Sequence, residues 1–474
     1  MSSSSIYWYD FETFGANPQK DRVCQFAGVR TDENLNIIGD PLVIFCKPSD
    51  DFLPNPFACL ITGITPQAAL AKGINEFEFT RKINEEFSTP NTCVVGYNNI
   101  KFDDEFMRRL LYRNLFDPYE REYKNQNSRW DIIDMVRLCG AVRPEGIEWP
   151  RTKTGRKSFK LDQLTVKNGI EHGDAHDALA DVLATIEIAK LIKTRQPKLF
   201  EYVFNLRDKN KVRAIASKAD KPILHIAARY SSQRGYLGLV LPICEHPTIR
   251  NRFIVYNLVH DPNNWIGLEA EEIEHRIQTH GTSPFGLISA SSCPIVVTPK
   301  ILTESAIKEY GLDLNRSLEN ARIVQKSHTI KATLSRIYSE RVAEKEADPD
   351  LMIYQGFFGD RDKAMMETVR NTKSADLGRL DLPFEDHRLD ELFFRYRARN
   401  FRETLTSDEV ARSDKYRKNK FKNDYLFQQF DNDMEEAAIH VGKTKIKNGS
   451  RILAELEEYA NPVSYTHLTL PTKA

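Results

Sequence analysis

The sequence has few cysteines, and none of them forms a recognisable metal or disulfide motif. Its seven cysteines are scattered and odd in number, and no Cys-x-x-Cys pair occurs. This pattern argues against a disulfide framework and against a cysteine zinc site. We therefore expect a protein of a reducing compartment.

Long apolar runs and net charge are lacking as well. No apolar run approaches the roughly eighteen residues that a membrane span needs, and the opening "MSSSS" has neither the charged nor the apolar segment of a secretory signal. We expect a cytoplasmic protein that does not engage a membrane. The formal net charge at pH 7 is +0, so any surface for nucleic acid must be a local basic patch.

The chain has 474 residues of ordinary globular composition, which is enough for about three domains. Strand and helix patterns alternate over residues 1–196 and predict an α/β domain with a mixed sheet flanked by helices. Four strand-like runs between turns predict a small, mostly β domain over 197–349: "KPILHIAARY", "GYLGLVLPIC", "NRFIVYNLV" and "CPIVVTP". Residues 350–461 read as charged helices and predict a helical C-terminal domain. Residues 462–474 do not continue the helical pattern, and we interpret them as a non-native tail.

The stretch "IYWYDFETFG", residues 6–15, reads as a buried strand that carries two carboxylates. Side chains two residues apart in a strand share a face. Asp10 and Glu12 are therefore expected on one face with Ile6 and Trp8, and the aromatic residues between them on the other. Unpaired buried carboxylates are costly, which favours a cation at this point. The alternative is a strand that simply reaches solvent at its end.

A second acidic site follows the short apolar run "NTCVVGYN". In "GYNNIKFDDEF", Asp103 stands at a predicted helix start, where an aspartate can also act as a helix cap. Asp104 and Glu105 fit the role of first-turn acids that face the helix dipole.

A third site is "HGDAHDALADVLATIEIAKLIK". Asp177 can cap the predicted helix, which leaves His176 in the loop before it and Asp181 in its first turns. A structural histidine is the alternative interpretation of His176, and His172 is a rival for any chemical role.

The motifs "DFET", "NIKFD" and "HDALAD", in this order, resemble the DEDDh class of 3′→5′ exonucleases, whose fold is ribonuclease H-like. Further segments resemble the bacterial exodeoxyribonuclease I family: "GYNNIKFDDEF", "NSRWDIIDMVR", "RPEGIEWP", "KTRQPKLF", "IYQGFF" and "FRYRARNF". The resemblance extends to about residue 460 and implies an exonuclease domain, an SH3-like barrel and a helical C-terminal domain. It also implies a Mg²⁺-dependent enzyme that degrades single-stranded DNA from the 3′ end to 5′ mononucleotides in DNA repair or recombination.

The carboxylates fit this chemistry. Hard oxygen ligands suit Mg²⁺, and two divalent cations can activate water and stabilise the leaving group in phosphodiester hydrolysis. The resemblance implies two Mg²⁺ ions, with Mn²⁺ as a substitute, held by Asp10, Glu12, Asp103 and Asp181. It also implies that His176 is the general base, a role that suits the pKa of imidazole.

Substrate and partner contacts are expected from other positions. The basic stretch 151–167 could contact phosphates, with a solvated loop as the alternative. The expected substrate contacts are Glu12, Lys160, Arg108, Tyr119, Tyr123 and Arg137. The resemblance further implies that the chain binds the acidic C-terminal peptide of single-strand DNA-binding protein, through Arg143, Tyr202 and Lys221.

Two rival functions remain open from the sequence. An RNA-trimming exonuclease of the same class would use the same carboxylates, because these read phosphate and not the 2′-hydroxyl. A non-catalytic scaffold for single-stranded DNA would keep the fold without the reaction. We expect a monomeric enzyme acting on DNA.

Overall fold

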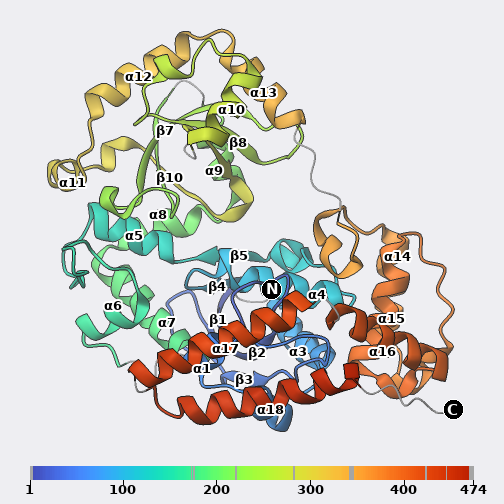
Figure 1. The fold of residues 1–474 in the computed structure, drawn as a ribbon. Coiled ribbons are helices and arrows are strands. Elements are labelled where there is room, and N and C mark those ends of the chain that lie inside the picture. Colours follow the sequence, from blue (N-terminus) through green and yellow to red (C-terminus); the bar gives the residue numbers. More distant parts are fainter. Residues whose placement is uncertain are drawn as a thin grey trace.

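The computed structural model describes residues 4–171, 173, 177–218, 221–280, 283–340, 346–421, 424–444 and 446–468. The chain forms three regions, and the second and C-terminal regions each lie beside the first, whose sheet is in the middle (Figure 1). Within these described residues, no helix combines the length and the apolar character that crossing a bilayer requires.

The first region is built on a five-stranded mixed sheet with the strand order β3-β2-β1-β4-β5. Its central strand β1 pairs antiparallel with β2 and parallel with β4, and β4 pairs parallel with β5. Ile6 and Trp8 of β1 enter one hydrophobic core, while Tyr7, Tyr9 and Phe11 enter a second core on the other face, as predicted. The strands are β1 (Ser5–Thr13), β2 (Val23–Thr31), β3 (Leu42–Phe45), β4 (Thr92–Gly96) and β5 (Ser128–Asp131).

Helices cover this sheet, and α7 packs directly against β1 and β2. The helices predicted to start at Asp103 and after Asp177 are present as α4 and α7. The helices of this region are α1 (Pro56–Thr62), α2 (Pro66–Lys72), α3 (Glu76–Ser88), α4 (Asp103–Arg113), α5 (Ile133–Val142), α6 (Leu161–Lys167) and α7 (Ala178–Arg195).

The second region contains another five-stranded sheet, with the order β10-β6-β7-β8-β9 and antiparallel pairing throughout. The sequence pattern predicts four of these strands but not β9. Glycine weakens a strand pattern, and β9 contains Gly286, where an added Cβ would stand only 1.9 Å from Nη1 of Arg229. Helices also flank the sheet, which the sequence pattern does not predict. The elements are α8 (Pro197–Asn205), α9 (Lys209–Ala216), β6 (Ile223–Ile226), β7 (Leu237–Glu245), β8 (Arg252–Asn257), α10 (Ala270–His280), β9 (Phe285–Ser289), β10 (Ile295–Val297), α11 (Glu304–Glu309), α12 (Leu314–Lys326) and α13 (Ile330–Glu340).

The hydrophobic core runs without interruption across the predicted boundary at residue 197. Phe200 and Phe204 of α8 pack edge-on against Trp130 of β5, with ring centroids 5.5 and 5.1 Å apart. One core cluster contains residues of both sheets. Helix α7 ends and α8 begins on either side of Gln196, next to the predicted boundary, but the core does not separate there. The predicted domain boundaries therefore stay predictions.

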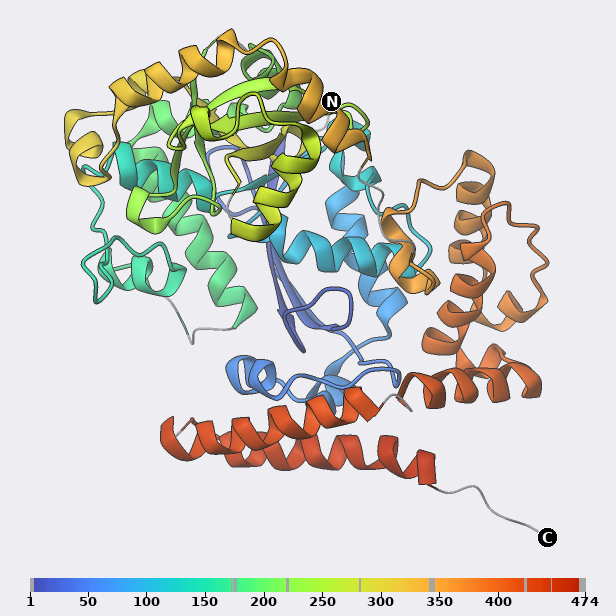
Figure 2. The ribbon, with the colours of Figure 1, turned by 45° about the horizontal axis from the view of Figure 1, so that its top comes forward.

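The C-terminal region is helical, and its last two long helices run side by side against α1 (Figure 2). The helix α18 continues to Leu468, so the prediction that the helical pattern ends at 461 is wrong for 462–468. A proline can lie within a helix and bend it without ending it. The helices are α14 (Asp360–Asn371), α15 (Arg388–Asn400), α16 (Ser407–Phe421), α17 (Asp424–Thr444) and α18 (Gly449–Leu468).

Buried ion pairs join this region to the first one. Asp350 accepts hydrogen bonds from Arg395 at 2.8 Å and from Arg399. Arg399 also donates to Asp51 of the first region at 2.8 Å, and Lys420 donates to the same carboxylate at 3.0 Å. Each buried charge is paired, which is the condition under which such groups are tolerated.

Candidate active site

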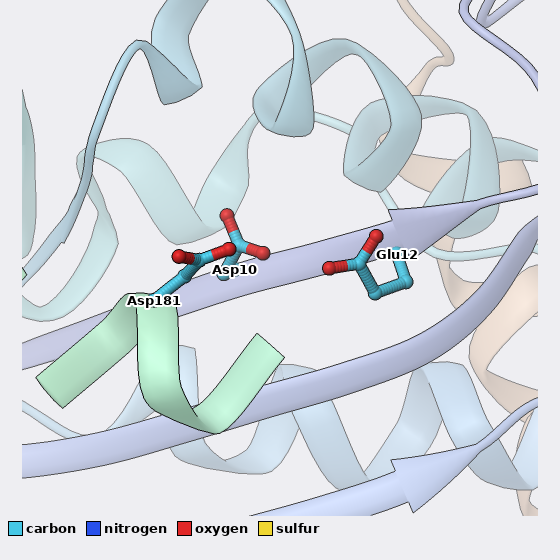
Figure 3. A group of neighbouring side chains, drawn as sticks. All are labelled: Asp10, Glu12 and Asp181. Atoms are coloured by element: carbon cyan, nitrogen blue, oxygen red, sulfur yellow. The ribbon is translucent and has the colours of Figure 1, made fainter. Parts of the chain in front are cut away.

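Three carboxylates converge where the second half of β1 meets the first turn of α7 (Figure 3). One oxygen from each of Asp10, Glu12 and Asp181 lies within 4.8 Å of the others. Glu12 is buried, and Asp10 and Asp181 are partly exposed. The strand period places Asp10 and Glu12 on one face, and the packing of α7 against β1 brings Asp181 to them.

Asp103 stands beside this group as the first residue of α4 and is buried. Its Oδ1 accepts a hydrogen bond from the backbone N–H of Phe11 at 3.2 Å. Because Phe102 occupies the N-cap position, the alternative that Asp103 merely caps the helix is wrong.

The carboxylates of the cluster are close enough to raise one another's pKa. Burial raises the pKa of Asp10 well above its ordinary value, and the carboxylates of Asp103, Glu12 and Asp181 raise it further. Burial likewise raises the pKa of Glu12 to about 9, followed by repulsion from Asp181 and Asp103. Several hard oxygen donors that repel one another at one point fit a divalent cation, which removes the repulsion.

The predicted cap of α7 is confirmed. The carboxylate of Asp177 accepts hydrogen bonds from the N–H groups of Leu179 and Ala180, each at 3.1 Å. This cap fixes the start of the helix and hence the position of Asp181 one turn later. The two candidate histidines, His172 and His176, lie outside the described residues.

Arg108 and Tyr119, two expected substrate contacts, take part in internal interactions. The guanidinium of Arg108 donates to Glu122 at 2.9 Å and to Glu105 at 2.7 Å, and it lies 5.3 Å from the ring centroid of Tyr119. The charge of Arg108 is thus already opposed by two carboxylates.

The other expected contacts differ in exposure. Arg137 is buried, donates to Asp134 at 2.6 Å and lies over the ring of Tyr236. Tyr123 and Lys160 are exposed, and Lys160 occupies the N-cap position of α6.

The basic stretch 151–167 is only partly a solvated loop. Lys157 donates to Glu309 and to the hydroxyl of Tyr310, both in the second region, at 3.1 and 3.2 Å. Arg151 donates to the backbone oxygen of Gly155 at 2.7 Å and is exposed.

Two of the three expected partner-binding residues line one cavity of about 570 Å³ between the first two regions. Arg143 and Tyr202 line it together with the basic residues Lys198 and Lys300. Lys221 is exposed and is not among the residues that line this cavity.

Sequence reasoning missed two aromatic residues beside Tyr119. The side chain of Phe357 is 79% exposed, and its ring centroid lies 5.4 Å from that of Tyr119. Tyr354 is also exposed, and its hydroxyl donates to Glu105. The motif "IYQGFF" signals a resemblance, but exposure of its rings depends on tertiary packing and cannot be read from the pattern.

Comparison with known proteins agrees with this geometry. Residues 7–189 match a family model described as "Exonuclease", 207–340 match "Exonuclease I SH3-like domain", and 347–463 match "Exonuclease I C-terminal domain". The predicted fold class, a ribonuclease H-like α/β region followed by an SH3-like and a helical region, is confirmed.

Similarity to individual proteins spans nearly the whole chain. Exodeoxyribonuclease I of Escherichia coli (strain K12) is 40% identical over 455 residues, which cover 92% of this chain and 96% of that protein. The crystal structure of E. coli exonuclease I in complex with a dA16 oligonucleotide has a TM-score of 0.93 at 39% identity and covers 97% of this chain and 100% of that one. A structure of SSB/exonuclease I in complex with the inhibitor CFAM has a TM-score of 0.91 at 38% identity and covers 98% and 100%.

The acidic cluster, the three matching regions and the full-length relatives agree with one another, and the chain belongs to the exodeoxyribonuclease I family.

Proposed function

We propose that this chain degrades single-stranded DNA from its 3′ end, releasing 5′ mononucleotides, with two Mg²⁺ ions for which Mn²⁺ can substitute. The single observation that supports this most is the convergence of Asp10, Glu12 and Asp181, with Asp103 beside them, in a member of the exodeoxyribonuclease I family. These four carboxylates would hold the cations, and Glu12 would also contact the substrate. Bound divalent cations would activate water and stabilise negative charge on the phosphate and the leaving group.

The general base in this proposal is His176. Its neighbour in the sequence, Asp177, lies close enough to Glu12 for its charge to raise the pKa of that carboxyl, after burial and the nearer carboxylates. Asp177, the N-cap residue of α7, therefore lies near the cluster, and a histidine next to it in the sequence is our candidate for the group that takes the proton from the attacking water.

Exposed rings support a path for the strand between the first and C-terminal regions. Tyr123, Tyr354 and Phe357 are all exposed, and Phe357 contacts Tyr119. Bases of any sequence can stack on such rings, while exposed cations such as Lys160 can contact phosphates. The solved relative that binds dA16 has the same fold along 97% of this chain.

We also propose that the cavity lined by Arg143, Tyr202, Lys198 and Lys300 takes the acidic C-terminal peptide of single-strand DNA-binding protein. Its basic residues suit the carboxylates of an acidic peptide. Arg143→Ala should weaken binding of a labelled acidic peptide in fluorescence anisotropy, whereas Arg379→Ala, at an exposed position in the C-terminal region, should not.

The proposed activity is tested with 3′-labelled single-stranded DNA, duplex DNA and RNA, in Mg²⁺ and then in EDTA. We expect rapid release of mononucleotides from single-stranded DNA only, and none in EDTA. Faster cleavage of RNA would favour the RNA-trimming alternative, and binding of DNA without cleavage would favour the scaffold. We expect sedimentation of the enzyme as a monomer; its place in the cytoplasm and in DNA repair stays a prediction.

A further inference from the structure

A fully buried carboxylate that is not itself one of the proposed cation ligands lies behind the active site. Asp104 accepts hydrogen bonds at Oδ1 from the hydroxyl of Tyr9, at 2.6 Å, and from Arg121, at 2.7 Å. Its Oδ2 accepts another from Arg129 at 2.7 Å. Both side-chain oxygens are therefore engaged, and two guanidinium groups compensate the one negative charge.

These contacts join the two elements that carry proposed ligands. Tyr9 directly precedes Asp10 in β1 and points to the opposite face of the sheet, and Asp104 directly follows Asp103 at the start of α4. A bond from Tyr9 to Asp104 therefore fixes the strand and the helix against each other at the residues next to the cluster.

Arg129 extends the same network into the second region. Another of its guanidinium nitrogens donates to the backbone oxygen of Ser291 at 3.1 Å, and its own backbone oxygen accepts from the thiol of Cys293 at 3.0 Å. Its Nε lies 3.2 Å from Glu122. Contacts with the second region thus fix the position of Arg129, which in turn donates to Asp104.

We propose that Asp104 is a positioning residue, which fixes the separation between Asp10 on β1 and Asp103 on α4 so that the site binds its divalent cation without rearrangement. This inference rests on the proposed function of the carboxylate cluster. Cation binding needs Asp10, Glu12, Asp103 and Asp181 in their charged forms, which repel one another, and this repulsion tends to drive β1 and α4 apart. The contacts of Asp104 oppose this, and groups that orient ligands in advance typically raise metal affinity.

The mildest test removes one hydroxyl. Tyr9→Phe deletes the donor to Asp104 and keeps the ring, and Tyr7→Phe is the matched control. Both tyrosines are buried in the same core on the same strand, but the ring of Tyr7 lies beneath Arg30 instead. Mn²⁺ binding to the DNA-free protein is followed by the electron paramagnetic resonance of the free ion. The Mg²⁺ concentration for half-maximal hydrolysis is measured in parallel.

We expect Tyr9→Phe to weaken Mn²⁺ binding and to raise the Mg²⁺ requirement at least about threefold, the scale of one lost hydrogen bond. Tyr7→Phe should leave both unchanged, and KM for DNA should not move in either variant. Equal Mn²⁺ affinity in wild type and Tyr9→Phe would overturn the inference, as would equal losses in the two tyrosine variants.

A second pair separates positioning from general stability. Asp104→Asn and Asp350→Asn each remove the charge of a buried aspartate that two arginines hold. Both should lower the melting temperature, but only Asp104→Asn should weaken Mn²⁺ binding, by about tenfold or more. A parallel loss of Mn²⁺ affinity in Asp350→Asn would assign the effect to stability alone and overturn the inference. If Asp104→Asn does not fold, the tyrosine pair decides.

The outcomes for the proposed function are distinct. A wild type that binds Mn²⁺ and does not hydrolyse DNA refutes the proposed function while the tyrosine pair still tests positioning. If the wild type hydrolyses DNA in Mg²⁺ but neither Tyr9→Phe nor Asp104→Asn changes the affinity for Mn²⁺, the proposed function stands and only the positioning role of Asp104 is refuted.

Discussion

The backbone N–H of Phe11 donates a hydrogen bond to Oδ1 of Asp103 at 3.2 Å. Phe11 stands between Asp10 and Glu12 in β1, and Asp103 opens α4. This one bond joins the strand and the helix at the centre of the carboxylate cluster. The peptide N–H compensates part of the negative charge of Asp103, although burial still holds the pKa of that carboxyl well above its ordinary value.

Asp10→Asn tests whether the charge at this point serves a cation. The variant keeps the volume and removes one negative charge, so the site should lose or misplace its cation. We expect release of mononucleotides to fall by orders of magnitude, while affinity for single-stranded DNA persists, because phosphate contacts elsewhere supply most of it. The two measurements are Mg²⁺-dependent hydrolysis and binding of a labelled oligonucleotide at fixed salt.

The control for this variant is Asp40→Asn, which changes an exposed aspartate and should affect neither measurement. Loss of hydrolysis and binding together, with a lowered melting temperature, would assign a structural role to Asp10. An unchanged rate of hydrolysis by Asp10→Asn would contradict the proposed metal-dependent mechanism.

His176→Ala tests the proposed general base against its rival in the sequence. We expect hydrolysis to slow by about 10²–10⁴-fold, the usual contribution of a positioned acid–base group. Mn²⁺ binding should change little, because the carboxylates remain. His172→Ala is the matched control from the same segment and should keep normal turnover; a reversed result would exchange the roles of the two histidines.

Much of the cluster could be predicted because its signals are local. The period of a strand fixes which residues of β1 share a face, and the cap at Asp177 fixes the start of α7. Order along the chain then matches "DFET", "NIKFD" and "HDALAD" to one class of enzyme. These patterns locate Asp10, Glu12 and Asp181 without any knowledge of tertiary contacts.

Asp104 could not be predicted in the same way. Two acids after Asp103 have the pattern of first-turn residues, which are common at exposed helix starts. Its burial depends on three partners, Tyr9, Arg121 and Arg129, that only the folded sheet brings to it. The same limit applies to Arg108. The sequence suggests a cation that can contact DNA, but the folded chain pairs this guanidinium with Glu105 and Glu122.

Phe357→Ala tests whether the exposed rings hold the DNA. An alanine removes one stacking surface, and each base–ring stack contributes about 1–3 kcal/mol. We expect affinity for a single-stranded oligonucleotide to fall roughly fivefold or more, with an unchanged melting temperature because the side chain is 79% exposed. Ile61→Ala, at another exposed apolar position on α1, is the control. Undiminished affinity in Phe357→Ala would exclude this ring from the path of the strand.

The buried histidine of the second region should make the fold sensitive to acid. His225 lies in β6, and its Nδ1 is 2.9 Å from the hydroxyl of Tyr230. Burial, followed by the charge of Arg229, lowers its pKa to about 3. Between an ordinary histidine pKa of about 6.5 and that value, the unfolded chain binds a proton that the folded chain does not. Stability therefore falls as pH falls through this window.

At pH 5 this linkage costs about 2 kcal/mol relative to pH 8. His225→Gln removes the titrating group, so its unfolding midpoint in urea should decline less between pH 8 and pH 5 than that of the wild type. The comparison uses the change with pH, because the substitution also alters packing at every pH. His387→Gln, whose parent side chain is 81% exposed, should follow the wild type. An equal decline in His225→Gln and wild type would show that other groups, and not this imidazole, set the acid sensitivity of the fold.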